Sequence, residues 1–341
     1  MKIELYEIYR DIYVEPAREA YEIALKYCYL PYMVQRYLDI LGEKEALELI
    51  RAFEKPVKPV VRTNTLVTAS SELKKRLSEL GFKLEEIPWA PGSFWVVEKP
   101  ANPTLGATHE YLKGYYYVHR DASSLLPVLL LLHDYVGDVL DACAAPGGKA
   151  TYIAQILKER GCGLVYANDL VLYRLKALIG HIMRMQLNNI VVLWSDARVL
   201  SSRFKRRFHR ILLDAPCSGE GRISVDPGRK SRTSLLDLAI LVKREIELLA
   251  SLIDLLEPGG VLAYVTCSIA PEENEYVVNY VIKARRSVEV IDPPLKLLDY
   301  SRGVVEFRNL KFSEEVEKCI RLWPHRHGLF GYTICLLRKK D

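Results

Sequence analysis

Two cysteines that follow two predicted strands are the strongest candidates for chemistry in this sequence. The strand predicted at 210–213 runs into Leu213-Asp-Ala-Pro-Cys217-Ser-Gly, and the strand predicted at 261–266 ends just before Cys267. In a doubly wound sheet the carboxyl ends of the strands form the ligand-binding edge, so we expect both thiols to face one cleft. A lone cysteine is usually a small buried hydrophobe, but two at matching strand ends indicate thiol chemistry.

A glycine-rich turn nearer the N-terminus has the features of a nucleotide-binding loop. The strand predicted at 139–142 leads into Ala145-Pro-Gly-Gly-Lys149 and then into a helix, so the backbone can approach a ligand closely. The turn is not a P-loop, because Cys143 stands where that motif has its first glycine, and it lacks the Gly-x-Gly-x-x-Gly dinucleotide fingerprint. Asp169 and Asp196 follow the next two strands, where carboxylates can accept from ribose hydroxyls and from an adenine amino group. Together these features predict a bound adenosine without a pyrophosphate, as in S-adenosyl-L-methionine.

A thiol beside a methyl donor suits methylation of an unactivated pyrimidine carbon. The C5 atom of cytosine is a poor nucleophile, but addition of a thiolate to C6 turns C5 into an enamine-like carbon that attacks the donor methyl group. A base must then remove the C5 proton so that the thiolate leaves, and a second cysteine nearby can assist that release. Since a free thiol has a pKa of about 8.5, neighbouring charge such as that of Lys149 has to favour the thiolate.

The elements that must position these side chains follow from the apolar periodicity. Residues 1–55 read as helices closed by Pro56 and Pro59, and residues 56–120 read as a small α+β module. From residue 121 a helix is followed by short strands alternating with helices, which predicts a mostly parallel, doubly wound sheet. Its seven strands are expected at 139–142, 164–168, 190–193, 210–213, 261–266, 288–291 and 332–337.

Composition bounds the class of protein. With 341 residues, 50% hydrophobic and 27% charged, the chain has the composition of a soluble globular protein, and its length predicts two domains or one large domain with a smaller one appended. The longest apolar run, 125–132, is shorter than the roughly 20 residues of a membrane span. The charged residues of the first turns exclude a secretory signal, so we expect a cytoplasmic protein.

The seven cysteines predict neither a disulfide framework nor a metal site. Their number is odd and no Cys-x-x-Cys pair occurs. Cys319, His325 and His327 are the nearest approach to a metal cluster, but their spacing fits no zinc signature, and we interpret the histidines as surface residues.

Charge is unevenly distributed along the chain. Residues 1–55 hold eight Lys/Arg against eleven Asp/Glu, whereas residues 201–232 hold nine Lys/Arg against three Asp/Glu. A basic stretch of that density is typical of a protein that binds a polyanion, although a solvated charged face explains it equally well on charge alone.

Three motifs resemble those of a known family, the RNA cytosine-C5 methyltransferases of the Nop/Sun group, and in particular their archaeal members. They are Asp141-Ala-Cys-Ala-Ala-Pro-Gly-Gly-Lys149, Leu213-Asp-Ala-Pro-Cys-Ser-Gly-Glu-Gly221 and Thr266-Cys-Ser-Ile-Ala-Pro-Glu-Glu-Asn-Glu275. Arg62-Thr-Asn-Thr65 is similar to the family's Arg-x-Asn-Thr element. The resemblance covers residues 58–340 and implies a Rossmann-like methyltransferase domain at 121–341, an RNA-binding module at 56–120 and S-adenosyl-L-methionine as the cofactor.

The resemblance also assigns roles to individual residues. It makes Cys267 the nucleophile and Cys217 the cysteine that aids product release, while Lys149 and Asp214 orient the cytosine and support proton movement. Spacing alone does not decide which cysteine attacks. The implied cofactor contacts are Cys143, Ala144, Ala145, Pro146, Gly147, Gly148, Lys149, Asp169, Arg174, Asp196 and Asp214.

The implied partner is structured RNA, either transfer or ribosomal. Because the basic stretch brackets Cys217, its cations would neutralise phosphates around a cytosine that is swung out of its stack. The candidate RNA contacts are Arg62, Asn64, Arg206, Arg207, Arg222, Arg229, Lys230 and Arg232. We expect a monomer without a membrane or metal partner, and we expect residues 1–55 to pack on the catalytic domain, since their net negative charge disfavours RNA.

Two alternatives stay open at this point. One is methylation of another acceptor such as an exocyclic amine, although that chemistry uses an Asp/Asn-Pro-Pro-aromatic loop that Asp214-Ala-Pro-Cys217 does not match. The other is a non-catalytic RNA-binding or ribosome-assembly factor, which would have no need for Cys217, Cys267 and Lys149.

Overall fold

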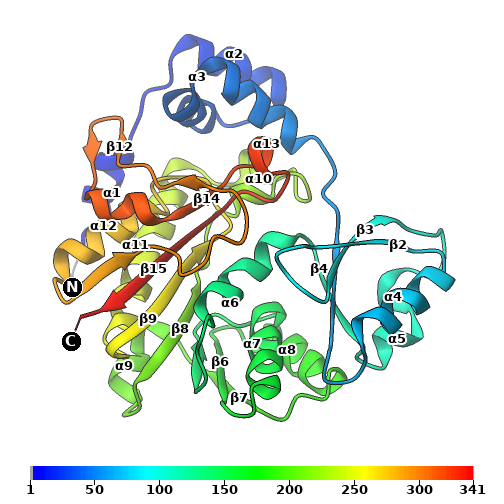
Figure 1. Ribbon diagram of the computed structural model, residues 1–341. Coiled ribbons are helices and arrows are strands. Elements are labelled where there is room, and N and C mark those ends of the chain that lie inside the picture. Colours follow the sequence, from blue (N-terminus) through cyan, green and yellow to red (C-terminus); the bar gives the residue numbers. More distant parts are fainter. Residues whose placement is uncertain (1–2, 341) are drawn as a thin grey trace.

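The computed structural model describes residues 3–340 of the chain. Helices at the N-terminus are followed by a small antiparallel sheet and then by a large mixed sheet with helices on both faces (Figure 1). Within the described range, the helices are all too short or too polar to cross a membrane.

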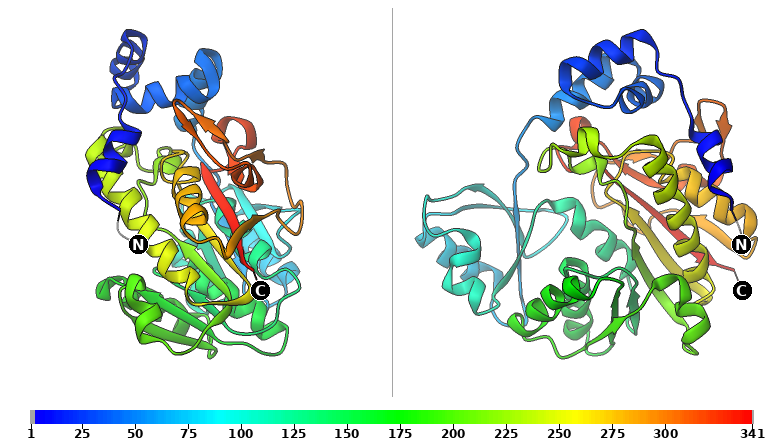
Figure 2. Two further views of the ribbon diagram at one scale, coloured as in Figure 1. Left: turned by 90° about the vertical axis from the view of Figure 1, so that its left-hand side faces the viewer. Right: turned by 180° about the vertical axis from the view of Figure 1, so that it is seen from behind.

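The N-terminal region forms part of the main core. It consists of α1 (Leu5–Ile12), α2 (Arg18–Tyr27) and α3 (Pro31–Phe53), which is kinked at Gly42. Helix α1 lies along α11 (Leu235–Ile253), buries Ile8 and Ile12 there and is tied to Tyr276, whose hydroxyl donates to Asp11 at 2.9 Å (Figure 2). The expected packing on the catalytic domain is therefore confirmed for the described part of this region, residues 3–55.

The small sheet has the strand order β2-β3-β1-β4 and is antiparallel. Its elements are β1 (Val60–Thr63), α4 (Ser70–Glu79), β2 (Lys83–Glu86), β3 (Ser93–Glu98), α5 (His109–Leu112) and β4 (Tyr116–His119). Val61, Leu73 and Phe94 are buried in a core that belongs to this sheet and α4. We did not predict β2, because three of its four side chains are charged and exposed.

The large sheet has the strand order β11-β14-β15-β9-β8-β5-β6-β7, and β10 pairs with β15. The parallel strands are β5 (Val139–Asp141), β6 (Val165–Asp169), β7 (Ile190–Trp194), β8 (Phe208–Asp214) and β9 (Leu256–Thr266). The antiparallel strands are β10 (Val288–Ile291), β11 (Ser301–Arg302), β14 (Ile320–Leu322) and β15 (Tyr332–Lys339).

Helices cover both faces of this sheet, as a doubly wound fold requires. Helices α6 (Leu126–Leu131), α7 (Gly148–Glu159) and α8 (Leu172–Arg184) pack on one face, and α11 and α12 (Glu275–Ala284) pack on the other. Successive strand residues point to opposite faces, so Val139 is buried beneath the first set and Leu140 beneath the second. The shorter elements are α9 (Leu200–Arg203), α10 (Arg229–Arg232), α13 (Pro324–His327), β12 (Glu306–Phe307) and β13 (Leu310–Lys311).

The expected α/β, Rossmann-like class is confirmed, with two differences. Within residues 3–340 the sheet has nine strands rather than seven, because the short strands β11 and β14 extend its antiparallel edge. Such runs of two and three residues carry little periodicity. A disulfide also joins Cys319 to Cys335, where we expected none: they are 16 residues apart in sequence, yet their Cα atoms lie 4.4 Å apart, next to the paired strands β14 and β15.

Candidate active site

A cavity of about 310 Å³ opens at the carboxyl ends of β5, β8 and β9. One wall comes from β4 and the turn after it, with Tyr117, His119 and Arg120. The sequence-predicted residues that line it are Cys143, Ala144, Ala145, Pro146, Gly148, Lys149, Asp214, Arg222 and Cys267. The topology thus brings the glycine loop and the reactive side chains to one place, as the strand-end argument predicted.

The two thiols are in contact. The Sγ atoms of Cys217 and Cys267 lie 3.4 Å apart, and Cys267 lines the cavity. A hydrogen bond from Cys217 lowers the pKa of Cys267 against the effect of burial, and the positive charges of Arg222 and Lys149 act in the same direction. The same sulfur contact, together with burial, raises the pKa of Cys217. The contact between the two sulfur atoms thus favours the thiolate of Cys267.

Lys149 and Asp214 form an ion pair beside the thiols. The Lys149 ammonium donates to Asp214 at 2.6 Å, and it also lies 5.6 Å from the centre of the Tyr332 ring. Burial alone would lower the pKa of Lys149, but the charges and hydrogen bonds of Asp214 and Tyr332 together outweigh it and the pKa is raised. The pair offers one charged donor and one charged acceptor to a ligand in the cavity.

The glycine loop is held in place from β6. The Asp169 carboxylate accepts from the backbone N–H of Ala145 at 3.1 Å, and Arg174 donates to the carbonyl of Ala145. Gly147 has φ of 113°, and a Cβ there would stand 2.8 Å from the Leu178 side chain. The loop therefore needs glycine at this position, and Asp169 and Arg174 fix its course.

Asp141 belongs to the site although we did not single it out from the sequence. It ends β5, lines the cavity and is 1% exposed, and both of its carboxyl oxygens lack a hydrogen-bond partner among the described residues. Burial, with repulsion by Asp214, raises its pKa to about 8. Its place as the last residue of a strand, next to the glycine loop, was the available signal. Such a buried, unpartnered acceptor is suited to a ligand that brings a donor.

Asp196 lies further away. Its carboxylate accepts from the guanidinium and the backbone N–H of Arg198, and it borders a separate hollow with Glu247. The Arg198 side-chain bond is the main cause of its lowered pKa. Its contact with adenine stays a prediction.

Two of the expected RNA contacts, Arg62 and Asn64, are wrong, because both side chains are buried. Arg62 is 1% exposed and donates to Thr151 at 3.0 Å and to Gln155, both on α7. The buried Asn64 amide donates to the carbonyls of Gly114 and Met185. Both residues join the small sheet to the large domain, and their side-chain N–H groups donate hydrogen bonds within that interface.

The first half of the basic stretch lies at the N-terminal end of β8, away from the cysteines. Arg206 pairs with Asp138, and Arg207 donates to the carbonyl of Asp254, both before the strand begins. Since seven residues of strand span about 20 Å, these cations lie far from the cysteines, and their expected place beside the target base is also corrected.

The second half of the basic stretch lies near the cysteines. Arg222 lines the cavity, and Arg229 donates to the carbonyl of Ser218. Lys230 pairs with Glu54 and Arg232 with Asp226. For these four the RNA contact stays a prediction.

The residues considered for a metal are engaged otherwise. Cys319 is in the disulfide and His325 is hydrogen-bonded to Glu45. Within residues 3–340 no three His, Cys, Asp or Glu side chains gather as metal ligands would.

The fold, the glycine loop and the placement of the site at the strand ends define a methyltransferase of the Rossmann-like class. A model of the family described as 16S rRNA methyltransferase RsmB/F matches residues 128–338, and a model of the N-terminal domain of 16S rRNA methyltransferase RsmF matches residues 30–119. The chain belongs to this RsmB/F family. The second match begins inside the region 1–55 that we expected to be separate.

Individual relatives agree with the family. A human 28S rRNA (cytosine(4447)-C(5))-methyltransferase is 35% identical over 93% of this chain, and a ribosomal RNA small subunit methyltransferase F from Aliivibrio salmonicida is 30% identical over 86%. The chain spans 39% and 60% of their respective lengths. A crystal structure of a methyltransferase homologue from Pyrococcus horikoshii is 31% identical, with a TM-score of 0.81 over 95% of this chain and 99% of that one.

Proposed function

We propose that this chain transfers a methyl group from S-adenosyl-L-methionine to C5 of a cytosine in structured RNA, through a covalent bond between Cys267 and C6. The observation that carries the proposal is the pair of thiols 3.4 Å apart, with Cys267 on the wall of a cavity that also holds Lys149 and Asp214. Methylation of a pyrimidine carbon needs this combination of a nucleophile and a second group to release it.

The residues present fit the cofactor. S-adenosyl-L-methionine carries an ammonium group, and Asp141 is a buried, unpartnered acceptor at the cavity. The turn is tightly enclosed at Gly147, where a Cβ would stand 2.8 Å from the Leu178 side chain, and a Cβ on Gly148 would touch the Tyr117 ring at 3.4 Å. Cys143 to Lys149 and Asp141 would hold the cofactor, which supplies an electrophilic methyl group when bound.

The chain's own side chains account for the other steps. The Cys267 thiolate forms the sulfur–C6 bond, which makes C5 nucleophilic. After C5 has gained the methyl group, the Asp214 carboxylate at the cavity accepts the C5 proton, the C5–C6 double bond is restored, and the sulfur–C6 bond breaks with its electrons returning to the Cys267 sulfur. Cys217 contacts the leaving sulfur. Asp214 can accept from the cytosine amino group, and Lys149 can donate to an acceptor of the ring.

Ribosomal RNA is the substrate class that the family supports, because the relatives are named as rRNA methyltransferases. The nucleotide has to leave its stack to reach a thiol inside the cavity. Arg222, at the cavity, and Arg229, Lys230 and Arg232, in the segment that follows, would meet the phosphates. We propose that the protein acts as a monomer, because the two thiols and the Lys149–Asp214 pair that the reaction needs already meet within a single chain.

The test is transfer of labelled methyl from S-adenosyl-L-methionine to ribosomal and transfer RNA. Wild type should label C5 of cytosine. Cys267→Ala should lose activity by at least a thousandfold, because the nucleophile is absent. Cys217→Ala should accumulate an RNA adduct that survives denaturing electrophoresis, because release is impaired.

Cys162→Ala is the matched control, since Cys162 is a free, exposed cysteine, and it should behave as wild type. Activity of Cys267→Ala would show that the thiol assignment is wrong. Label on an exocyclic amine would favour the other acceptor chemistry, and RNA binding without any methylation would favour a non-catalytic factor.

A further inference from the structure

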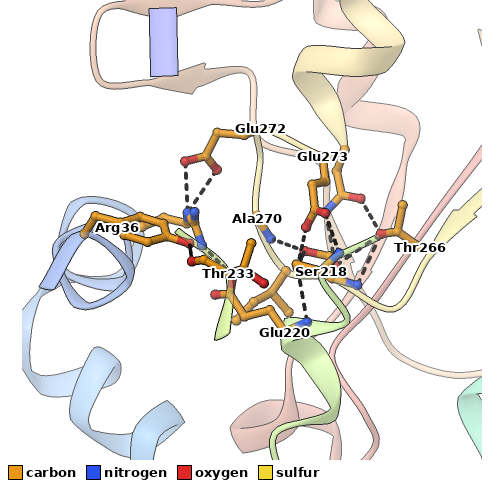
Figure 3. Close-up of polar contacts among 12 residues, drawn as sticks. Arg36, Ser218, Glu220, Thr233, Thr266, Ala270, Glu272 and Glu273 are labelled. Carbon is orange, nitrogen blue, oxygen red and sulfur yellow. Dashed lines mark hydrogen bonds and ion pairs between the residues drawn. The ribbon is translucent and has the colours of Figure 1, made fainter. Parts of the chain in front are cut away.

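Arg36, in the N-terminal helix α3, is completely buried next to the two loops that carry the thiols, residues 215–221 and 267–274, which we call the cysteine loops. Its Nη1 donates to Glu220 at 2.5 Å and its Nε donates to Glu272 at 3.0 Å. Glu220 is 2% exposed and Glu272 is 0% exposed. Figure 3 shows Arg36 reaching from α3 to these two carboxylates, beside Ser218 and Glu273.

Each carboxylate sits one residue from a bond that joins the loops. The backbone N–H of Gly221, next to Glu220, donates to the carbonyl of Cys267 at 2.9 Å. Glu273, next to Glu272, accepts from the backbone N–H and the hydroxyl of Ser218, both at 2.6 Å. Ser218 directly follows Cys217. The guanidinium therefore connects the loop that carries one thiol to the loop that carries the other.

Stability alone does not explain this arrangement. Two buried carboxylates face one guanidinium, and a buried ion network of this kind can usually be replaced by apolar side chains at no net cost in folding free energy. A planar guanidinium, however, holds two carboxylates at fixed angles, which a lysine ammonium does not do. The geometry is suited to fixing the position of the loops.

We propose that Arg36 is a positioning residue, which ties both cysteine loops to helix α3 and thereby sets the contact between the Cys217 and Cys267 thiols. The N-terminal helices thus take part in assembling the active site. The consequence for methylation rests on the proposed function, whereas the contact between the thiols does not.

The pH dependence of Cys267 alkylation measures that contact directly, because the bond from Cys217 is what lowers the pKa of Cys267. The charged and titratable groups that face Cys267 are Cys217, Asp214, Arg222, Lys149, Tyr332 and Glu245. A substitution of Arg36 removes none of these, so a changed midpoint reports a changed arrangement or the lost charge of Arg36 itself.

The experiment is iodoacetamide labelling of the full chain between pH 5 and 10, with the rate at Cys267 read by peptide mass mapping. In Arg36→Met the midpoint should rise by about one pH unit, which is about a tenfold lower rate at pH 7. Arg36→Lys keeps the positive charge but lacks the planar guanidinium that binds two carboxylates at once, so its midpoint should rise too, by a smaller amount. The exposed Arg51 lies on the same helix, and Arg51→Met should match wild type.

Two results would overturn the proposal. One is an alkylation midpoint of Cys267 that is unchanged in Arg36→Met. The other is a midpoint that shifts in Arg36→Met but not in Arg36→Lys, because the shift would then come only from the lost positive charge of Arg36. If Arg36→Met does not fold, the triple variant Arg36→Met/Glu220→Gln/Glu272→Gln also removes the two buried carboxylates that have lost their partner. This variant should show the same raised midpoint. An unchanged midpoint there also refutes the proposal.

In the methylation assay, Arg36→Met should lower kcat by at least tenfold while KM for S-adenosyl-L-methionine stays unchanged, since the glycine loop is not touched. If wild type methylates no RNA, the proposed function fails, and the alkylation midpoints still decide the role of Arg36.

Discussion

Asp141, at the end of β5, illustrates how the surroundings of a single side chain set its charge. Its pKa is raised from an ordinary value of 3.8 to about 8, first by burial and then by repulsion from Asp214. The folded protein therefore holds a proton that the unfolded chain releases at low pH. Stability from this group is fully present below pH 4 and is lost as the pH rises through 8.

The substitution Asp141→Asn should remove this dependence, because an amide cannot ionise. The difference in free energy of unfolding between the variant and wild type should grow in favour of the variant by at least about 1 kcal/mol between pH 5 and pH 8. Urea unfolding at both pH values measures it. A difference that is the same at both would mean that Asp141 is already ionised at pH 5.

At the scale of an element, the turn between β5 and α7 depends on its glycine. The left-handed backbone at Gly147 costs any other residue about 1–2 kcal/mol, and an added Cβ would press on Leu178 of the neighbouring helix α8. The same turn forms one side of the cofactor site, so stability and binding depend on one residue.

Gly147→Ala should therefore lower the free energy of unfolding by at least about 1 kcal/mol and weaken S-adenosyl-L-methionine binding, measured by urea unfolding and calorimetry. Gly180→Ala is the control within α8: a Cβ there meets nothing within 4 Å, and alanine should stabilise the helix by about 0.5–1 kcal/mol. Equal stability of Gly147→Ala and wild type would contradict the strain at this turn.

At the scale of the whole molecule, the N-terminal helices and the large domain share one hydrophobic core. Ile8 and Ile12 of α1 are fully buried in the same cluster as Leu249 of α11 and Val277 of α12. We therefore expect residues 1–55 to unfold together with the sheet and not before it.

Ile12→Ala should lower the free energy of unfolding of the entire chain by about 3 kcal/mol, since it leaves a cavity in that core. Leu25→Ala, in the neighbouring helix α2, removes a side chain that is 86% exposed and should change it by less than about 0.5 kcal/mol. Circular dichroism during urea unfolding should show one transition for both. A separate early transition for Ile12→Ala would contradict a shared core.

The sequence by itself determined the α/β class and most of the active site. Cys217, Cys267 and the loop ending at Lys149 each follow a predicted strand, and they were expected at one edge of the sheet because the carboxyl ends of parallel strands always meet there. The same local patterns missed β2 and β14, since charged or very short strands have little apolar periodicity.

Only the tertiary structure decided which polar residues face solvent. Arg62 and Asn64 look like surface residues in the sequence, yet they are buried between two domains, and Arg206 lies just before β8, at the end of that strand away from the cysteines. Arg36 and Glu272 are 236 residues apart and meet in the interior. Such long-range contacts depend on how the elements pack, and the periodicity of any one segment does not record them.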